Sequence, residues 1–249
     1  MLKYWDNLWK KDNYYASYDI PSNTDGIYYL LKGAVKEYST EKTLLEVGSG
    51  PATRSIPFAK STGLQLHLLD PLESAHELAK KRAARYGMTC TNIVGSVLDI
   101  PTKDNVYDYV VSIGLNEHFL NEDRKKCFSE MYRVTKENGT CVVIVPNLWG
   151  SINIEKFLKE KNNTWKFGVT KFFNIFELRN MMKECGFKKV NIYGVSYFSG
   201  IVRVLPVDVQ RKIFKSKAWE IITRFPFNLN INFFVNKLFG EEIMAVGEK

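Results

Sequence analysis

The chain reads LLEVGSGPATRSIPFA over residues 44–59, and this stretch decides its fold. An apolar run ends in Glu46 and Val47, and Gly48 and Gly50 then flank a turn that leads into a helical pattern. Glycine tolerates positive φ and lets the backbone approach a ligand closely. The third glycine with which dinucleotide sites bring the helix close to the strand is absent. The stretch therefore predicts a buried strand, a ligand-binding turn and a helix.

Strand and helix patterns alternate along the chain outside this turn. We predict strands at 43–49, 64–70, 91–96, 107–114, 139–147, 188–198 and 241–249, and helices at 22–39, 53–61, 73–87, 123–135 and 174–186. Such near-continuous apolar strands favour a parallel sheet that is covered on both faces. The predicted fold class is α/β, a doubly wound, mostly parallel seven-stranded sheet whose last strand joins antiparallel as an edge strand. The expected units are an N-terminal helical lid (1–40), a core (41–198 and 241–249) and a helical cap insertion (199–240).

Composition allows one large α/β domain, or such a domain with a cap, in 249 residues. The net charge of +8 comes wholly from residues 150–249, which hold 17 basic and 9 acidic residues, whereas residues 1–149 hold 18 of each. This asymmetry fits a surface for an anionic partner or a set of solubilising lysines. The four cysteines form no CxxC pair, and neither a signal peptide nor an apolar run of about 18 residues is visible. We therefore expect a cytoplasmic protein with reduced thiols.

Acidic residues at the ends of the first two strands point to the kind of ligand. Asp70 ends its strand 20 residues after Gly50, where an acid can accept hydrogen bonds from both hydroxyls of a ribose. Glu46 precedes the glycine turn, and a carboxylate there opposes a pyrophosphate but suits a cationic amino group or sulfonium. These features favour adenosylmethionine over a nicotinamide cofactor.

Five segments in the correct order resemble the class I adenosylmethionine-dependent methyltransferases. LLEVGSGPA resembles the glycine motif of that family, with Ala52 at the third glycine position, and HLLDP resembles its ribose segment. NIVGSVLDIPTKDNVYDYVVS, EMYRVTKENGTCVVIVPN and FNIFELRNMMKECGFKKVNIYG resemble later segments of its sheet. The resemblance implies a methyltransferase with S-adenosyl-L-methionine as cofactor. The residues it places at the cofactor are Glu46, Gly48, Ser49, Gly50, Asp70, Pro71, Ser96, Val97, Gly114 and Leu115.

The adenine segment departs from the family pattern. Ser96 stands where the family often has the aspartate that accepts from the adenine amino group. Asp99 either takes over that role or is a solvated loop residue.

The methyl acceptor is expected near the end of the fourth strand, at SIGLNEHF. Glu117 and His118 are the candidate catalytic residues, with His118 as a general base or as a residue that only orders the loop. His67 and His76 are interpreted as structural. Related methyltransferases with Glu-x-x-Glu-His can bind a divalent ion, but Gly114 stands at the first of these positions, so we expect no metal.

The insertion at 199–240 has seven basic residues against Asp208 and Glu220, interleaved with aromatic residues. We interpret it first as a cap over a small-molecule acceptor, then as a peripheral membrane contact, and last as an RNA surface. A dehydrogenase, a nucleic-acid or lipid-surface methyltransferase and a catalytically idle cofactor-binding domain remain alternatives. The acceptor and the oligomeric state are not indicated by the sequence.

Overall fold

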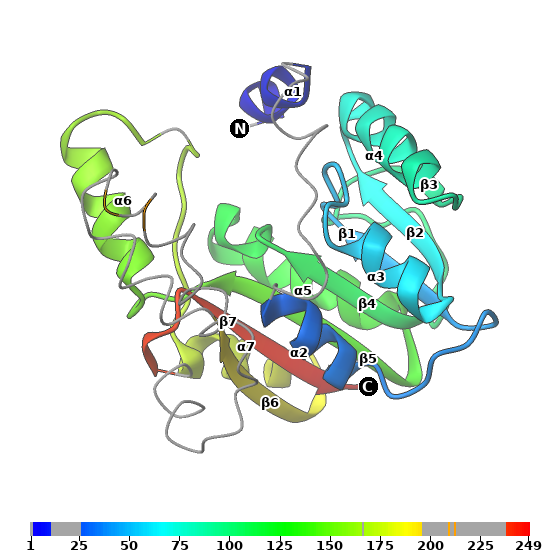
Figure 1. Cartoon of the computed structure of the whole chain (residues 1–249). Helices are drawn as coiled ribbons and strands as arrows, with labels where there is room; N and C mark the ends of the chain where they lie inside the picture. The colour runs from blue at the N-terminus through cyan, green and yellow to red at the C-terminus, as the bar shows by residue number, and fades with distance from the viewer. Residues whose placement is uncertain (1, 11–25, 166, 196–208, 210–211, 213–237) are drawn as a thin grey trace.

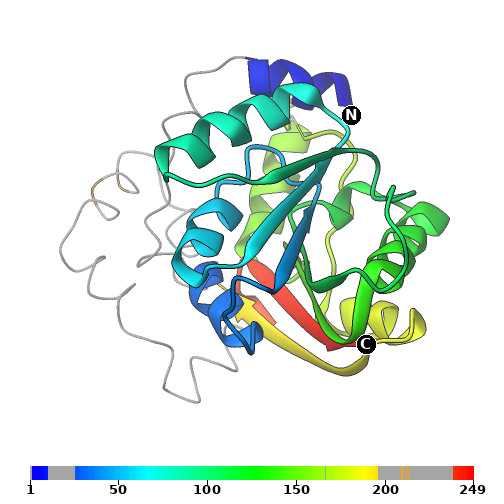
Figure 2. The ribbon, with the colours of Figure 1, turned by 90° about the vertical axis from the view of Figure 1, so that its right-hand side faces the viewer.

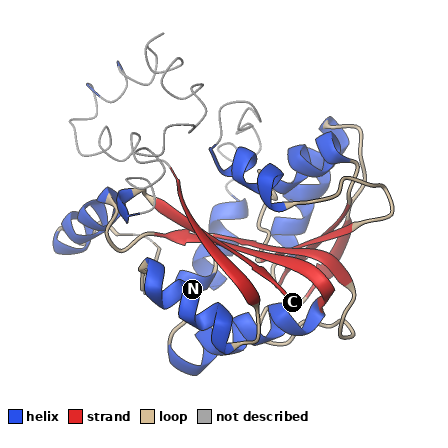
Figure 3. Cartoon of the chain, turned by 90° about the horizontal axis from the view of Figure 1, so that it is seen from below, coloured by secondary structure: helices blue, strands red, loops and turns tan. Residues whose placement is uncertain are grey.

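The computed structural model describes residues 2–10, 26–165, 167–195, 209, 212 and 238–249. They form one seven-stranded sheet in the order β3-β2-β1-β4-β5-β7-β6, with helices on both faces (Figures 1 and 3). The strands are β1 (Thr43–Val47), β2 (Gln65–Asp70), β3 (Thr91–Val94), β4 (Tyr107–Ile113), β5 (Thr135–Pro146), β6 (Lys188–Val195) and β7 (Glu242–Glu248). The helices are α1 (Leu2–Lys10), α2 (Gly26–Ala34), α3 (Ser55–Thr62), α4 (Glu73–Arg85), the 3-10 turn η1 (Asn116–His118), α5 (Asn121–Val134), α6 (Ser151–Lys161) and α7 (Ile175–Glu184).

The predicted fold class is confirmed, but the predicted edge position of the last strand is wrong. β7 runs antiparallel between β5 and β6, which makes β6 the edge strand. Burial explains this order, because β7 is buried along most of its length whereas β6 has three exposed residues. A strand that is covered on both sides needs a pairing partner on both edges.

Two apolar clusters hold the layers together. Phe128 and Leu178 are fully buried between the sheet and helices α5 and α7 on one face. Ile27, Ile56 and Ala79 bring α2, α3 and α4 against the other face. The predicted lid region is thereby divided, because α2 packs on the sheet whereas α1 lies beside α4 at the sheet's edge (Figures 1 and 2). The domain boundaries stay predictions, and most of the proposed cap at 199–240 lies outside the described residues.

Local signals explain where the helices end. Gly87 and Gly186 follow α4 and α7 with positive φ, and the amides after them close back onto Ala83 and Met182. This is the glycine-terminated geometry that the sequence predicts. Helix α6 was not predicted: none of its residues is buried, and Phe157 is 64% exposed. A helix without a buried face lacks the periodic signal on which such predictions depend.

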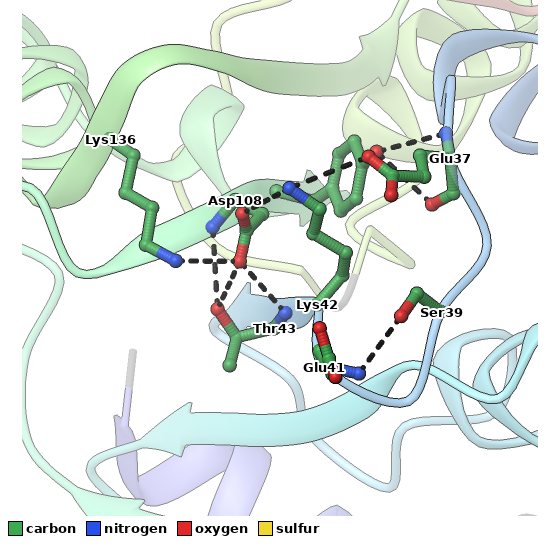
Figure 4. A network of polar contacts seen from close by, with 8 residues as sticks. Glu37, Ser39, Glu41, Lys42, Thr43, Asp108 and Lys136 are labelled. Carbon is green, nitrogen blue, oxygen red and sulfur yellow. Dashed lines mark hydrogen bonds and ion pairs between the residues drawn. The ribbon is translucent and has the colours of Figure 1, made fainter.

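The amino ends of β1 and β4 are joined by a network around Asp108 (Figure 4). Its carboxylate accepts hydrogen bonds from the Lys42 and Lys136 ammonium groups and from both the amide and the hydroxyl of Thr43, at 2.9–3.2 Å. Burial alone would raise the pKa of Asp108, but these donors hold it far below its usual range. Asp108 therefore remains ionised and ties the two strands together.

Candidate functional site

A cavity of about 370 Å³ opens at the carboxyl ends of β1, β2 and β4. This is the position at which open α/β sheets bind ligands, and the volume is sufficient for a small-molecule ligand. The cavity is lined by Leu2, Trp5, Trp9, Glu46, Gly48, Ser49, Gly50, Pro51, Thr53, Arg54, Asp70, Pro71, Leu72, Gly95, Ser96, Val97, Leu98, Ile113, Gly114, Leu115, His118 and Phe119.

The glycine turn forms the floor of this cavity. Gly48 and Gly50 have φ of 64° and 48°, and a Cβ on Gly48 would come within 2.6 Å of the Leu115 side chain. Ala52, at the position of the family's third glycine, also has a positive φ of 50° and is fully buried. The backbone thus keeps the conformation that suits glycine although the residue has changed.

Asp70 stands beside the turn and is 7% exposed. One carboxylate oxygen accepts from the Gly50 amide and the other from the Leu72 amide, each at 2.9 Å. Burial raises the pKa of Asp70 even though both bonds oppose the rise. His76 supports this strand end, because its Nε2 donates to the Asp70 carbonyl oxygen at 3.0 Å. Asp70 therefore connects the glycine turn to the second strand while facing the cavity.

Glu46 reaches the cavity from the end of β1 and is 4% exposed. Its Oε2 makes no hydrogen bond within the described part of the chain, nor does the buried hydroxyl of the neighbouring Ser49. Burial raises the pKa of Glu46 to about 8 against the opposing effects of the Ser55 hydroxyl and the Arg54 guanidinium. Buried polar groups are almost always satisfied in folded proteins, so both groups indicate a position for a polar ligand.

The segment that the resemblance aligns with adenine binding lies in the cavity wall, to which it contributes Gly95, Ser96 and Val97. Ser96 is exposed, and its hydroxyl accepts from the Leu98 amide at 3.1 Å. Asp99 is exposed and does not line the cavity; its amide donates to the Ser96 carbonyl oxygen. This location favours the solvated-loop interpretation of Asp99.

Glu117 and His118 lie on η1 immediately after β4. His118 lines the cavity, whereas Glu117 lies behind it, with Oε1 4.0 Å from His118 Nε2. Neither Glu117 Oε2 nor His118 Nδ1 has a hydrogen-bond partner in the described residues. Burial raises the pKa of Glu117 to about 8 and lowers that of His118 to about 4. Both side chains are therefore mainly neutral at pH 7.

Helix α1 covers the cavity with two indole rings. Trp5 and Trp9 stack at 5.3 Å, and Trp5 meets His118 edge-on at 5.6 Å between ring centroids. Trp9 lies over the turn, because a Cβ on Gly50 would stand 3.1 Å from its ring. The Ser74 hydroxyl donates to Asp6 at 2.8 Å and fixes the helix to α4. Of the other aromatic residues near the N-terminus, Tyr4 lies on α1, while Tyr14, Tyr15 and Tyr18 fall outside the described residues.

Several lining residues were missed from the sequence. Arg54 and Thr53 reach the cavity from the turn into α3, and Leu72 and Leu98 complete its walls. Arg54 follows the glycine motif directly, and a cation at the start of that helix was the signal that could have identified it as a partner for an anionic group.

Two general findings bear on the expected chemistry. No group of three or more His, Cys, Asp or Glu residues within the described ranges could hold a metal ion. In the same ranges, no helix has the length and apolarity needed to cross a membrane.

Comparison with known proteins agrees with the fold and the cavity. Residues 44–139 match the family model described as a methyltransferase domain. Ajmaline N-methyltransferase of Rauvolfia serpentina is 29% identical over 105 residues, which cover 41% of this chain and 35% of that protein. The chain spans about half, or less, of the length of the curated relatives it matches.

Solved structures resemble the whole chain at low sequence identity. The structure of an adenosylmethionine-dependent methyltransferase from Thermotoga maritima, described as a possible histamine N-methyltransferase, has a TM-score of 0.62 at 15% identity and covers 100% of both chains. A Haemonchus contortus phosphoethanolamine N-methyltransferase in complex with S-adenosyl-L-methionine has a TM-score of 0.60 at 16% identity, covering 90% of this chain and 51% of that one. The fold expected from the resemblance is confirmed.

Proposed function

We propose that this chain, whose residues 44–139 match the family model described as a methyltransferase domain, is an adenosylmethionine-dependent methyltransferase that acts on a small molecule at oxygen or nitrogen. Its cofactor is S-adenosyl-L-methionine, which supplies a methyl group activated by a sulfonium. The reaction is an in-line displacement, so the protein's main task is to align the acceptor atom with that methyl group.

The observation that carries the proposal is the pair of buried acids at the glycine turn. Glu46 has an oxygen without a hydrogen-bond partner within the described residues, and Asp70 faces the same cavity 20 residues after Gly50. An acid with spare acceptor capacity suits the amino group of the cofactor, and an acid at the end of β2 suits ribose hydroxyls. Arg54, on the cavity wall, would bind the cofactor's carboxylate.

The remaining cofactor contacts come from backbone and small side chains. Ser49, Pro71, Ser96, Val97, Gly114 and Leu115 line the cavity and are proposed to bind the cofactor together with the glycines. Asp99, exposed and outside the lining, is not retained in this set.

The methyl acceptor is proposed to bind in the part of the cavity next to His118, with Glu117 behind that side chain. His118 Nδ1 has no hydrogen-bond partner among the described residues, so it can accept a proton or a hydrogen bond from an acceptor group. The relatives support a small-molecule acceptor, since ajmaline and phosphoethanolamine are both small molecules in the names of those proteins.

Calorimetric titration with S-adenosyl-L-methionine and S-adenosylhomocysteine tests the proposal, with NAD as the negative control. We expect both to bind and NAD not to bind. Asp70→Ala should weaken both affinities by about 1–3 kcal/mol, because ribose hydroxyls lose their partner. Asp99→Ala is the matched control and should leave both affinities unchanged. Because Asp70 also accepts from two amides, thermal unfolding of each variant must show that it is folded.

Absence of binding by the folded wild-type protein would contradict the proposal. In that case Ala52 and Ser96 would mark a lost cofactor site, and a catalytically idle domain would be the better description. Unchanged affinity in a folded Asp70→Ala variant would remove Asp70 from the site.

A further inference from the structure

Buried polar atoms that the fold itself does not use lie on His118, which lines the cavity, and on two residues outside its lining, Glu117 and Thr170. Glu117 Oε2, His118 Nδ1 and the Thr170 hydroxyl have no hydrogen-bond partner within the described residues. The segment that contains Thr170 is held to η1, because the amide of the next residue, Lys171, donates to the Glu117 carbonyl oxygen at 2.9 Å. A folded protein leaves such groups unsatisfied at sites where a ligand completes them.

Glu117 has no counter-ion within hydrogen-bond reach in the described residues. Arg124 is the nearby cation, but its guanidinium donates to Glu177, the Phe119 carbonyl oxygen and the Lys171 carbonyl oxygen. His118, at 4.0 Å, is neutral, and Glu242 from β7 adds a further negative charge toward Glu117. A 95% buried carboxyl group in this setting lacks only a cation.

Aromatic rings form a cluster that reaches His118 through Trp5. Trp5 meets His118 edge-on, and Phe167 lies 5.9 Å from Trp5 and 5.0 Å from Trp165. Ring faces attract ammonium groups and exclude water, which strengthens the attraction of a carboxylate for a cation.

We propose that the methyl acceptor is a primary or secondary amine on an aromatic or apolar body, and that it enters as an ammonium ion with Glu117 as its counter-ion and final proton acceptor. The inference rests on the proposed function, because it assigns the acceptor of that same site. His118 contacts the amine through Nδ1, and Glu117 acts through His118 as a positioning residue and proton acceptor.

The proton and electron balance is simple. Glu117, which is mainly neutral before the ligand enters, gives its proton to solvent as the cation arrives, because a nearby positive charge favours the carboxylate. The ammonium ion then passes one proton through His118 to this carboxylate and becomes a neutral amine. The nitrogen lone pair then attacks the methyl carbon, the new N–C bond forms as the S–C bond breaks, and the bonding pair returns to sulfur. The products are a methylated ammonium ion and the neutral thioether, and Glu117 is again protonated, so one proton in total has gone to solvent.

Proton affinities support an amine over an alcohol. Burial raises the pKa of Glu117 to about 8, which brings it nearer than an ordinary carboxyl group to an alkylammonium group, for which the lysine side chain at about 10.4 is a guide. An alcohol holds its proton far more tightly, so the same carboxylate is a poor base for it.

Transfer of a labelled methyl group to matched probes tests the acceptor class. The probes are the amine, alcohol and carboxylic acid carried on benzyl, 2-phenylethyl, 2-(indol-3-yl)ethyl and 2-(imidazol-4-yl)ethyl skeletons. We expect label in at least one amine, at a rate at least about tenfold above its matching alcohol and acid, as loss of one charged contact implies. Preferential labelling of alcohols or acids overturns the inference, as does labelling of no probe by protein that binds the cofactor. Failure to bind the cofactor contradicts the proposed function instead.

A binding experiment tests the role of Glu117 independently of turnover. The probe is N,N,N-trimethyl-2-phenylethylammonium, titrated into the S-adenosylhomocysteine complex. Glu117→Gln should raise its Kd at least about tenfold and leave the cofactor Kd unchanged, whereas the exposed Glu122→Gln should change neither. In turnover of an amine, Glu117→Gln should also abolish the rise in rate as pH increases toward 8. Unchanged probe affinity together with an unchanged pH profile overturns the role of Glu117.

Discussion

Buried carboxyl groups lie at both ends of the pair of strands β1 and β4, and they differ in their hydrogen-bond partners and in their ionisation. At the amino end, Asp108 accepts from two lysines and from Thr43 and stays ionised. At the carboxyl end, Glu46 and Glu117 each keep an oxygen without a partner in the described residues, and burial raises the pKa of each to about 8. An acid that the protein itself satisfies stabilises the fold, whereas an acid left unsatisfied is available to a ligand.

The largest change in the free energy of unfolding is expected at the amino ends of β1 and β4. Asp108→Ala should lower the free energy of unfolding by about 3 kcal/mol, because it leaves the Thr43 amide and two lysines without their shared acceptor. The folded-state pKa of Asp108 is depressed, so its contribution is present above pH about 4 and is lost as the pH falls further. Urea unfolding at several pH values measures both effects.

The control for Asp108→Ala is Asp104→Ala, which removes an acid that is 66% exposed and paired with Arg133. Its effect should stay below about 1 kcal/mol. Cofactor affinity should be unchanged in both variants. A weaker cofactor affinity in Asp108→Ala alone would show that the two ends of the strands are not independent.

At the carboxyl end of the strands, we expect a smaller change in the free energy of unfolding, and of opposite sign. Glu46 has a raised folded-state pKa, so between pH about 4.5 and 8 the unfolded chain binds fewer protons at this group than the folded chain, and stability falls as the pH rises. Glu46→Gln removes this penalty and should increase the free energy of unfolding at pH 7.5 by about 2 kcal/mol, with little change near pH 4.5. Urea unfolding at the two pH values measures the difference.

The same substitution should weaken the binding of the cofactor. Glu46→Gln is expected to raise the Kd of S-adenosyl-L-methionine about tenfold, because the cation of the ligand loses its carboxylate. Calorimetry of the wild type in buffers with different ionisation enthalpies should show proton release on binding near pH 7. A variant that is less stable and binds normally would mean that Glu46 is a structural acid like Asp108.

The smallest effect is expected at the third glycine position. Ala52→Gly relieves a positive φ, but it also removes a buried methyl group and adds freedom to the unfolded chain. These terms oppose one another, so thermal unfolding should show a change within about 1 kcal/mol and calorimetry a nearly unchanged cofactor affinity. A large loss of affinity would give the Ala52 side chain a role of its own at the cavity.

The sequence predicted most of the sheet because each core strand is a continuous apolar run bounded by glycine, proline or an acid. It also predicted Glu46, Asp70 and His118 at the cavity, since each follows directly from a strand end. The position of β7 was not predictable from its own residues, because insertion between two strands depends on pairing with β5 and β6. Arg54 and the Trp9 contact with Gly50 were missed for a related reason: they depend on how turns and helices approach in space.

The location of β7 also has a consequence for how the chain acquires its fold. β6 ends at Val195, and the strand that links it to the rest of the sheet begins 47 residues later, at Glu242. During synthesis β6 is complete before β7, the strand with which it pairs in the described sheet, so the edge of β6 that β7 later covers stays unpaired until then. Long-range pairing of this kind slows folding and exposes strand edges to other chains. The strand that joins β6 to the sheet is therefore made after the other six, and completion of the sheet depends on residues 242–248 as well as on the glycine turn.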